Sequence, residues 1–99
     1  MKVNITSLHF KADKKLENFI QTKVEKLNGF YDGILGSEVI LKLEKNEKEA
    51  NKIAEIRLKI AGNDLYAKKQ SKTFEQATDT AVEALKKQIT KHKEKIKGI

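Results

Sequence analysis

Hydrophobic and polar positions follow recognisable periods over the first third of the chain. Apolar residues alternate imperfectly with polar ones from about Lys2 to His9, which predicts a strand. Asp13 is a candidate helix N-cap, and the apolar residues after it recur at helical spacing until Asn28-Gly29 interrupts the pattern. These residues are Leu16, Phe19, Ile20, Val24 and Leu27. The segment is therefore predicted to form an amphipathic helix of about four turns.

The middle of the chain carries the two-residue period of half-buried strands. Apolar and polar residues alternate from Val39 to Leu43 and again from Ala54 to Ile60. The polar segment between them, Lys45 to Asn51, predicts a solvated hairpin loop. Gly62-Asn63-Asp64 suits a tight turn, so a fourth strand is expected from Leu65 to Ser71. Its inward positions would be Leu65, Ala67 and Lys69, of which the lysine fits poorly.

A second helical pattern closes the chain. Thr73 is a plausible cap, and no glycine or proline follows it until Gly98. The buried stripe of this helix would be Phe74, Ala77, Ala81, Val82, Leu85 and Ile89. The predicted order is β-α-β-β-β-α, and a right-handed crossover makes the first two strands parallel. We therefore expect an α+β fold, in which a mixed four-stranded sheet carries both helices on one face.

Length and composition predict one folded domain over residues 1–99. Apolar residues make up 38% of the chain and charged residues 35%, which suits a soluble folded protein. The sequence has no cysteine, so it offers no disulfide and no thiolate ligand. Its first residues contain no continuous apolar stretch of the kind that a signal peptide needs, and a cytoplasmic location is expected.

Positive charge is concentrated at the end of the last predicted helix. The formal net charge is +7, and the chain after Leu85 carries six lysines against the single acid Glu94. A helix from Thr73 to Lys97 would be roughly 37 Å long, whereas a strand of about eight residues spans roughly 27 Å. Its last turns should therefore overhang the sheet. Helical spacing sorts their side chains into one row of Lys86, Thr90, Lys93 and Lys97 and another of Lys87, Lys91 and Lys95.

This charge allows two interpretations. Lysines favour the negative end of the helix dipole, so the segment could be an ordinary solvated helix end. Like charges at these spacings also repel each other, which favours a polyanionic partner such as nucleic acid. Lys23 and Lys26 on the first helix, and Lys68 and Lys72 around the fourth strand, could extend such a surface, although each taken alone is expected to be an ordinary solvent-exposed lysine.

Candidate catalytic chemistry is scarce. His9 and His92 are the only histidines, and their spacing offers no metal site. No nucleophile is paired with a base, so an enzyme is not expected, nor is a cofactor. His92 either prolongs the apolar stripe or donates to a phosphate. Phe30 and Tyr31 are expected to cover the edge of the core, which makes base stacking an unexpected mode of binding.

Several segments resemble the bacterial ribosome hibernation promoting factors and the related ribosome-associated inhibitors. They are Asn4-Ile5-Thr6, Lys23 to Leu27, Phe30-Tyr31-Asp32 and the closing run from Leu85 to Lys97. The resemblance covers nearly the whole chain and implies the short form of the family, without the long form's dimerisation domain. The segment from Tyr66 to Lys72 is more basic than the family pattern suggests.

The resemblance implies a ribosome-binding protein that is a monomer off the ribosome. Such a protein binds ribosomal RNA of the small subunit in the channel used by mRNA and tRNA, blocks translation when growth stops under stress or in stationary phase, and preserves idle ribosomes. By the same resemblance, the RNA-binding residues are Lys23, Lys26, Lys86, Lys87, Lys91, His92, Lys93 and Lys95.

Two other functions compete with this one. The last three strands and the final helix also resemble a double-stranded-RNA-binding module, which would recognise RNA shape through phosphate contacts. That module carries its lysines at the start of the helix, near Lys72, whereas this chain masses them at the end. A membrane-surface or protein-docking helix is the other alternative, but the sheet already requires the apolar stripe.

Overall fold

The computed structural model describes residues 1–45 and 50–96. Its elements are β1 (Val3–Ser7), α1 (Lys14–Glu25), the 3-10 turn η1 (Lys26–Gly29), β2 (Ile34–Leu43), β3 (Lys52–Ile60), β4 (Asn63–Ser71) and α2 (Phe74–Ile96). The predicted order of strands and helices is confirmed. Residues 46–49 of the predicted hairpin loop and Lys97 at the predicted end of the last helix lie outside the described residues.

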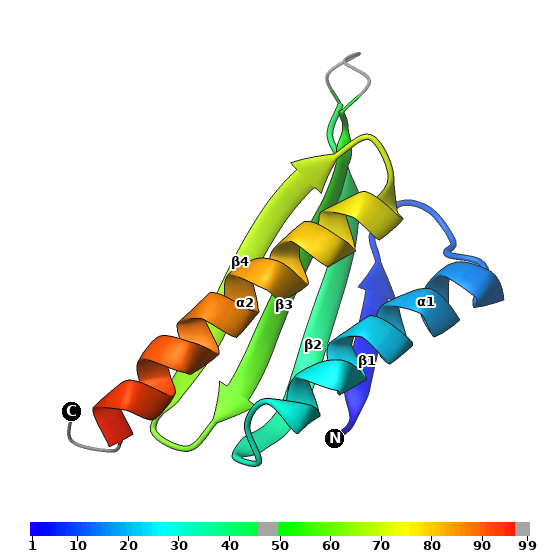
Figure 1. The fold of residues 1–99 in the computed structure, drawn as a ribbon. Coiled ribbons are helices and arrows are strands. Elements are labelled where there is room, and N and C mark those ends of the chain that lie inside the picture. Colours follow the sequence, from blue (N-terminus) through cyan, green and yellow to red (C-terminus); the bar gives the residue numbers. More distant parts are fainter. Residues whose placement is uncertain (46–49, 97–99) are drawn as a thin grey trace.

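The four strands form one mixed sheet in the order β1-β2-β3-β4. β1 runs parallel to β2, and the other two neighbouring pairs are antiparallel. Figure 1 shows both helices on the same face of this sheet, with α2 crossing it diagonally along β3 and β4 and α1 lying beside it. The predicted α+β architecture is therefore confirmed.

Local capping explains where both helices begin. The side chain of Asp13 accepts a hydrogen bond from the backbone N–H of Leu16 at 2.8 Å. At the start of α2, the Thr73 hydroxyl accepts one from the N–H of Gln76 at 3.0 Å. Each bond satisfies an N–H group that has no partner within its own helix. Both caps were predicted from the sequence.

The core lies between the helices and the inner face of the sheet. Inward residues of the strands, among them Leu41, Ile56 and Leu58, are fully buried against Leu85 and Ile89 of α2. Each such side chain contributes about 1.5–3 kcal/mol by its burial. The apolar stripe predicted for the last helix is buried throughout, from Phe74 to Ile89.

The start of β2 differs from the prediction. The strand begins at Ile34, five residues before the alternation at Val39 becomes visible in the sequence. Its register with β3 shifts between Ile34 and Gly36, and the polar Ser37 is buried there. A backbone hydrogen bond from the Ser37 N–H to the Lys2 carbonyl at 2.9 Å ties this segment to the chain before β1. Pairing with neighbouring strands, which has no local signature, therefore extends β2.

A side chain of α2 occupies the free edge of β4. The Gln88 amide donates to the Tyr66 carbonyl at 2.8 Å and accepts from the Tyr66 N–H at 3.3 Å. Gln88 thereby satisfies two edge-facing groups of the sheet as a neighbouring strand would. The contact anchors α2 to the sheet just before its lysine-rich end.

Neither helix within the described residues is long and apolar enough to cross a membrane.

The outer face of the sheet, opposite the helices, carries a network of paired charges around Glu55. This carboxylate contacts the Lys42 ammonium at 2.5 Å and accepts a hydrogen bond from the Tyr66 hydroxyl at 2.8 Å. Burial raises the pKa of Glu55, but the hydrogen bonds from Lys42 and Tyr66 and the charges of Lys42 and Lys68 outweigh it. The pKa therefore lies below the ordinary value of 4.5. Burial and the bond to Glu55 raise the pKa of Tyr66 above 10.0.

A depressed pKa makes the contribution of Glu55 depend on pH. The stabilisation by the ionised Glu55 is fully present above the pKa of this group in the unfolded chain. It is lost as the pH falls through the lower pKa of the folded protein. We expect Glu55→Gln to lower the free energy of unfolding by about 1–3 kcal/mol near neutral pH, and this difference to vanish in acid. Urea unfolding at several pH values measures it. Glu38→Gln, at the more exposed ion pair with Lys59, is the control. A difference independent of pH would contradict the assignment.

Candidate nucleic-acid interface

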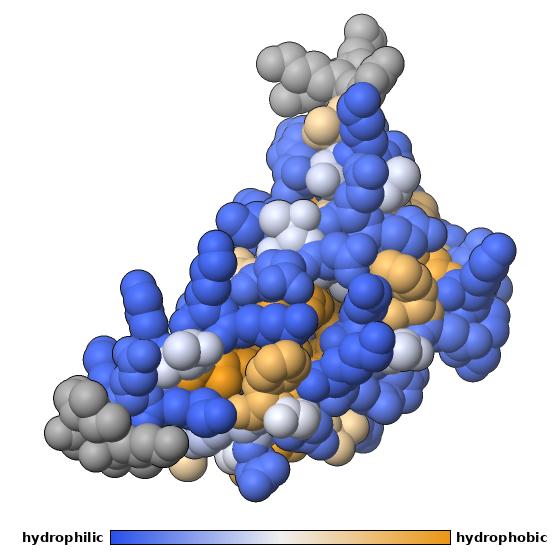
Figure 2. All heavy atoms as spheres, viewed as in Figure 1, coloured by the Kyte–Doolittle hydropathy of each residue, from blue (hydrophilic) through white to orange (hydrophobic). Residues whose placement is uncertain are grey.

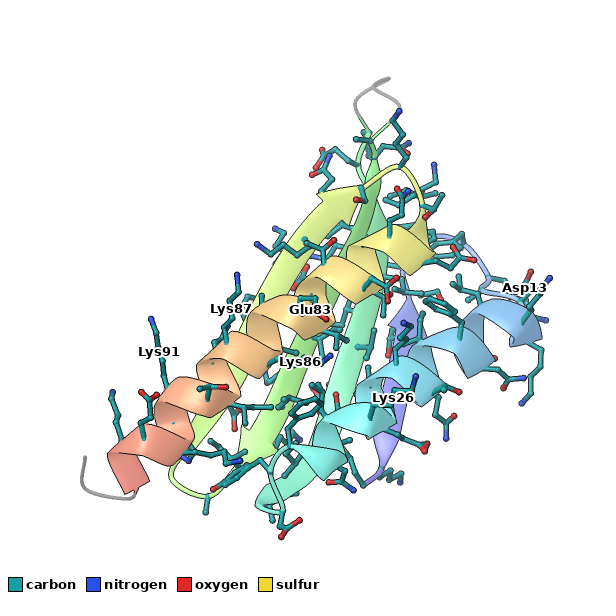
Figure 3. The ribbon with its side chains drawn as sticks, viewed as in Figure 1. Asp13, Lys26, Glu83, Lys86, Lys87 and Lys91 are labelled. Carbon is teal, nitrogen blue, oxygen red and sulfur yellow. The ribbon has the colours of Figure 1, made fainter. Side chains whose placement is uncertain are left out.

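The row formed by Lys87, Lys91 and Lys95 is exposed along one side of α2. Successive members are four residues apart, so they lie one above the other on the helix surface. Figure 3 shows Lys87 and Lys91 pointing away from α1. Within the described residues, none of the three has an ion pair or a side-chain hydrogen bond. Their ammonium groups are therefore available to a phosphate-rich partner.

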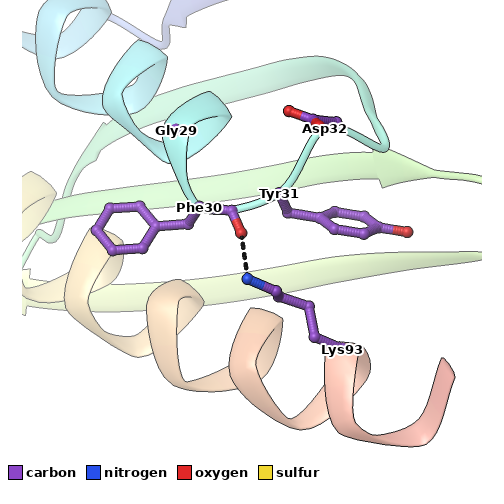
Figure 4. A pocket seen from close by; sticks show the side chains of 5 residues that line it. All are labelled: Gly29, Phe30, Tyr31, Asp32 and Lys93. Carbon is purple, nitrogen blue, oxygen red and sulfur yellow. Dashed lines mark hydrogen bonds between the residues drawn. The ribbon is translucent and has the colours of Figure 1, made fainter. Parts of the chain in front are cut away.

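The other predicted row faces the loop between η1 and β2. Lys86 points toward α1 (Figure 3), and its ammonium lies 5.0 Å from the centre of the Phe30 ring and 3.2 Å from a Glu83 carboxylate oxygen. Lys93 donates a hydrogen bond to the Phe30 carbonyl at 2.9 Å (Figure 4). Thr90 lies between them and donates to the Lys86 carbonyl. This row is thus partly engaged within the protein, and Lys97 lies outside the described residues.

The two candidate lysines near the end of α1 differ in their surroundings. The Lys23 ammonium is 3.0 Å from an Asp79 carboxylate oxygen on α2 and 5.6 Å from the centre of the Phe19 ring. Lys23 therefore links the two helices, and its charge is partly neutralised. Lys26 opens η1 and is exposed, with no ion pair to a described residue. Of the two, Lys26 offers the freer charge.

His92 is half-buried and contacts the loop before β2. Its Nε2 lies 3.3 Å from the Tyr31 hydroxyl, and the two rings meet edge to face with their centroids 5.3 Å apart. The Tyr31 ring folds over Gly33, where an added Cβ would lie 2.5 Å from it. Gly33 thus leaves room for the ring that receives His92. His92 and Lys93 therefore both contact this loop. That the end of the helix overhangs the sheet is still only a prediction.

One expectation about neighbouring residues is wrong, and one possible extension of the surface is not seen. Phe30 does not cover the core edge, because 45% of its surface is exposed, whereas Tyr31 does pack against the core. Lys68 does not extend the α2 surface, because it lies on the outer face of the sheet, where its charge acts on Glu55. Lys72 lies beyond the end of β4, and the structure leaves its predicted contribution untested.

Two acids of the surface between the helices were not predicted from the sequence. Asp79 and Glu83 lie one turn apart on α2 and bind Lys23 and Lys86, respectively. The spacing of four residues placed them on one side of the helix, but it could not show that α1 packs there. Net positive charge therefore increases toward the end of α2.

The described residues include no cluster of three or more potential metal ligands.

Comparison with known proteins gives this surface a context. The family model described as Sigma 54 modulation protein / S30EA ribosomal protein matches residues 3–97. A ribosome hibernation promoting factor of Klebsiella oxytoca is 31% identical over 97 residues, covering 98% of each chain. The factor of the same name from Escherichia coli K12 is 30% identical, again over 98% of each chain.

Solved structures share the fold at lower identity. A ribosomal subunit interface protein from Coxiella burnetii superposes with a TM-score of 0.82 at 19% identity, covering 94% of this chain and 98% of its own. The N-terminal domain of Protein Y from Thermus thermophilus has a TM-score of 0.79 at 20% identity, covering 93% of this chain and 99% of its own. On the strength of the sequence matches, the chain belongs to the Sigma 54 modulation protein / S30EA ribosomal protein family, which confirms its resemblance to the hibernation promoting factors.

Proposed function

We propose that this protein is a ribosome hibernation factor. It binds ribosomal RNA of the small subunit in the channel used by mRNA and tRNA, and thereby inhibits translation and preserves idle ribosomes. Relatives that match this chain over nearly their whole length are named ribosome hibernation promoting factors, which supports the role in hibernation. The role requires no catalysis, because a folded wedge that occupies the channel excludes tRNA by its volume.

One observation carries the proposal for RNA: the row of Lys87, Lys91 and Lys95 has no described partner within the protein. Lysine is a point charge that binds phosphate and cannot form the paired hydrogen bonds by which arginine reads a base. Lys26, exposed at the start of η1, and Lys93, beside the loop, add further positive charge. The surface therefore suits the sugar-phosphate backbone of folded RNA, where binding releases condensed counterions.

Acids within the surface restrict where phosphate binds. Asp79 and Glu83 hold Lys23 and Lys86, so a phosphate near these lysines would also meet a carboxylate. The last turns of α2 carry no such pairs within the described residues. We therefore place the main RNA contacts on the end of α2 and assign Lys23 and His92 a larger part in holding the surface together.

Cosedimentation with ribosomal subunits tests the proposal. We expect the chain to pellet with small subunits and not with large ones, and added tRNA to release it in proportion to tRNA occupancy. Ribosomes from starved cells should carry the tagged chain under the same conditions. Binding that tRNA leaves unchanged would place the site outside the channel. No binding in dilute buffer would refute the proposed function.

A parallel titration separates the competing RNA function. A double-stranded-RNA-binding module would bind free duplex RNA as tightly as small subunits, because it recognises the shape of the duplex. A hibernation factor should bind the duplex far more weakly. Nuclease treatment completes the test, because an association that survives digestion of the RNA would favour a protein or membrane partner.

A further inference from the structure

Phe30 is an exposed aromatic ring in the middle of the basic surface. Its neighbours Leu27 and Tyr31 pack into or against the core, but 45% of Phe30 itself remains exposed. Figure 2 shows an apolar patch between the C-terminal half of α2 and the end of α1, bordered by hydrophilic residues. An exposed phenyl ring gains nothing from the solvent around it. The core therefore gives no reason for its position.

Two lysines of α2 contact Phe30, and one of them, Lys86, also pairs with Glu83. Lys86 holds its ammonium 5.0 Å from the ring centre, within the range of a cation–π contact. Lys93 donates to the backbone carbonyl of the same residue. Both lysines belong to the row that faces the loop, so phosphates that approach the end of α2 pass beside Phe30. An aromatic ring interleaved with lysines is the arrangement by which proteins hold unpaired nucleotides.

The loop beside the ring is hollowed. An open hollow of about 310 Å³ is lined by Gly29, Phe30, Tyr31, Asp32 and Lys93 (Figure 4). The Asp32 carboxylate disfavours a phosphate inside it. A nucleobase has no such conflict, because it is uncharged and its amino groups donate to carboxylate and carbonyl oxygens. The Phe30 ring points away from Tyr31 and Asp32 (Figure 4), so the hollow adjoins the ring on the side of its backbone and leaves room for an uncharged group next to the platform.

We propose that Phe30 is a stacking platform for an unpaired nucleobase of the bound RNA, with Lys93, nearer the end of α2, holding the adjoining phosphate. This inference rests on the proposed function, because it deepens the same RNA-binding surface. It adds a contact that is not electrostatic to a surface otherwise made of charges. Stacking tolerates any base, since every base has a π face.

The other exposed aromatic residue provides a matched control. Tyr66 is 40% exposed, and Arg57 lies 5.2 Å from its ring centre, so it resembles Phe30 in both exposure and cation contact. It lies on the outer face of the sheet, however, where its hydroxyl donates to Glu55. Three cations on that face are held by acids, including Arg57, which pairs with Asp64. It should not meet the RNA.

Binding to small subunits at several salt concentrations tests the inference. We expect Phe30→Leu to weaken binding about tenfold and to leave the slope of log K against log salt unchanged, because the ring neutralises no phosphate. Phe30→Trp should retain the affinity, and Tyr66→Leu should match the unmodified chain. Equal affinity of Phe30→Leu and the unmodified chain would overturn the inference while leaving the proposed function standing.

Fluorescence gives a reading that does not depend on the folding of the leucine variant. The chain has no tryptophan, so Phe30→Trp introduces a single reporter. We expect small subunits to quench its emission, after subtraction of a mixture with the unmodified chain, and to leave that of Tyr66→Trp unchanged. Bound Phe30→Trp protein with unquenched emission would refute stacking. Failure of the unmodified chain to bind subunits would instead refute the proposed function, before any variant is compared.

Discussion

Changing Lys87, Lys91 and Lys95 together to glutamate should abolish binding to small subunits and leave thermal unfolding close to that of the unmodified chain. The three side chains are exposed and have no ion pair or side-chain hydrogen bond to a described residue, so folding loses little with them. Each charge-assisted hydrogen bond to a phosphate contributes about 1.5–3 kcal/mol. Losing three should weaken binding by at least about a thousandfold, and repulsion between glutamate and phosphate adds to the loss.

A second triple variant controls for net charge. Lys11, Lys14 and Lys15 are exposed around the start of α1, at the opposite end of the molecule from Lys91, as the position of Asp13 in Figure 3 shows. Their reversal changes the net charge by the same amount, and glutamate in a first helical turn is favourable. We expect this variant to keep most of its affinity. Equal loss of binding would mean that total charge matters more than its location, and loss of folding in the first variant would mean that the helix end is structural.

Salt should weaken the binding steeply. About six phosphate contacts cost roughly a thousandfold in affinity between about 50 and 200 mM salt, because counterions must condense again on the RNA when the protein leaves. The slope of log K against log salt, measured by sedimentation or fluorescence anisotropy, counts these contacts. A slope near zero would contradict an electrostatic interface.

Single substitutions connect that slope to particular lysines. Removing a lysine that contacts phosphate lowers the slope by about 1. We expect Lys87→Gln to do so, because its ammonium forms no ion pair with a described residue. Lys23→Gln should change the slope less, since Asp79 already neutralises part of that charge. The reverse order of the two effects would move the RNA from the end of α2 to the space between the helices.

Features that depend on nearby residues were predictable from the sequence. The side chains of Asp13 and Thr73 each accept a hydrogen bond from the backbone N–H three residues later. The buried stripe from Phe74 to Ile89 repeats at helical spacing. Both signals lie within one element, so no knowledge of the fold is needed to read them. The order of the elements and the chirality of the crossover then determined the sheet.

The candidate site was predictable only in part, because the row of Lys87, Lys91 and Lys95 follows from helical spacing whereas the state of each other lysine does not. Lys23 binds an acid on the other helix, and Lys93 binds a loop carbonyl 63 residues earlier in the chain. The exposure of Phe30 likewise depends on which surfaces pack beside it. No period within the sequence contains that information.

Local patterns along this chain were enough to predict the types and order of its elements, the family and the concentration of lysines near the C-terminal end. The tertiary structure alone decided which charges are free, which are held by acids, where Gln88 completes the sheet edge and why Phe30 stays exposed. The physical reason is range: capping and periodicity act over a few residues along the chain, whereas ion pairing and burial depend on neighbours that folding brings together from distant positions.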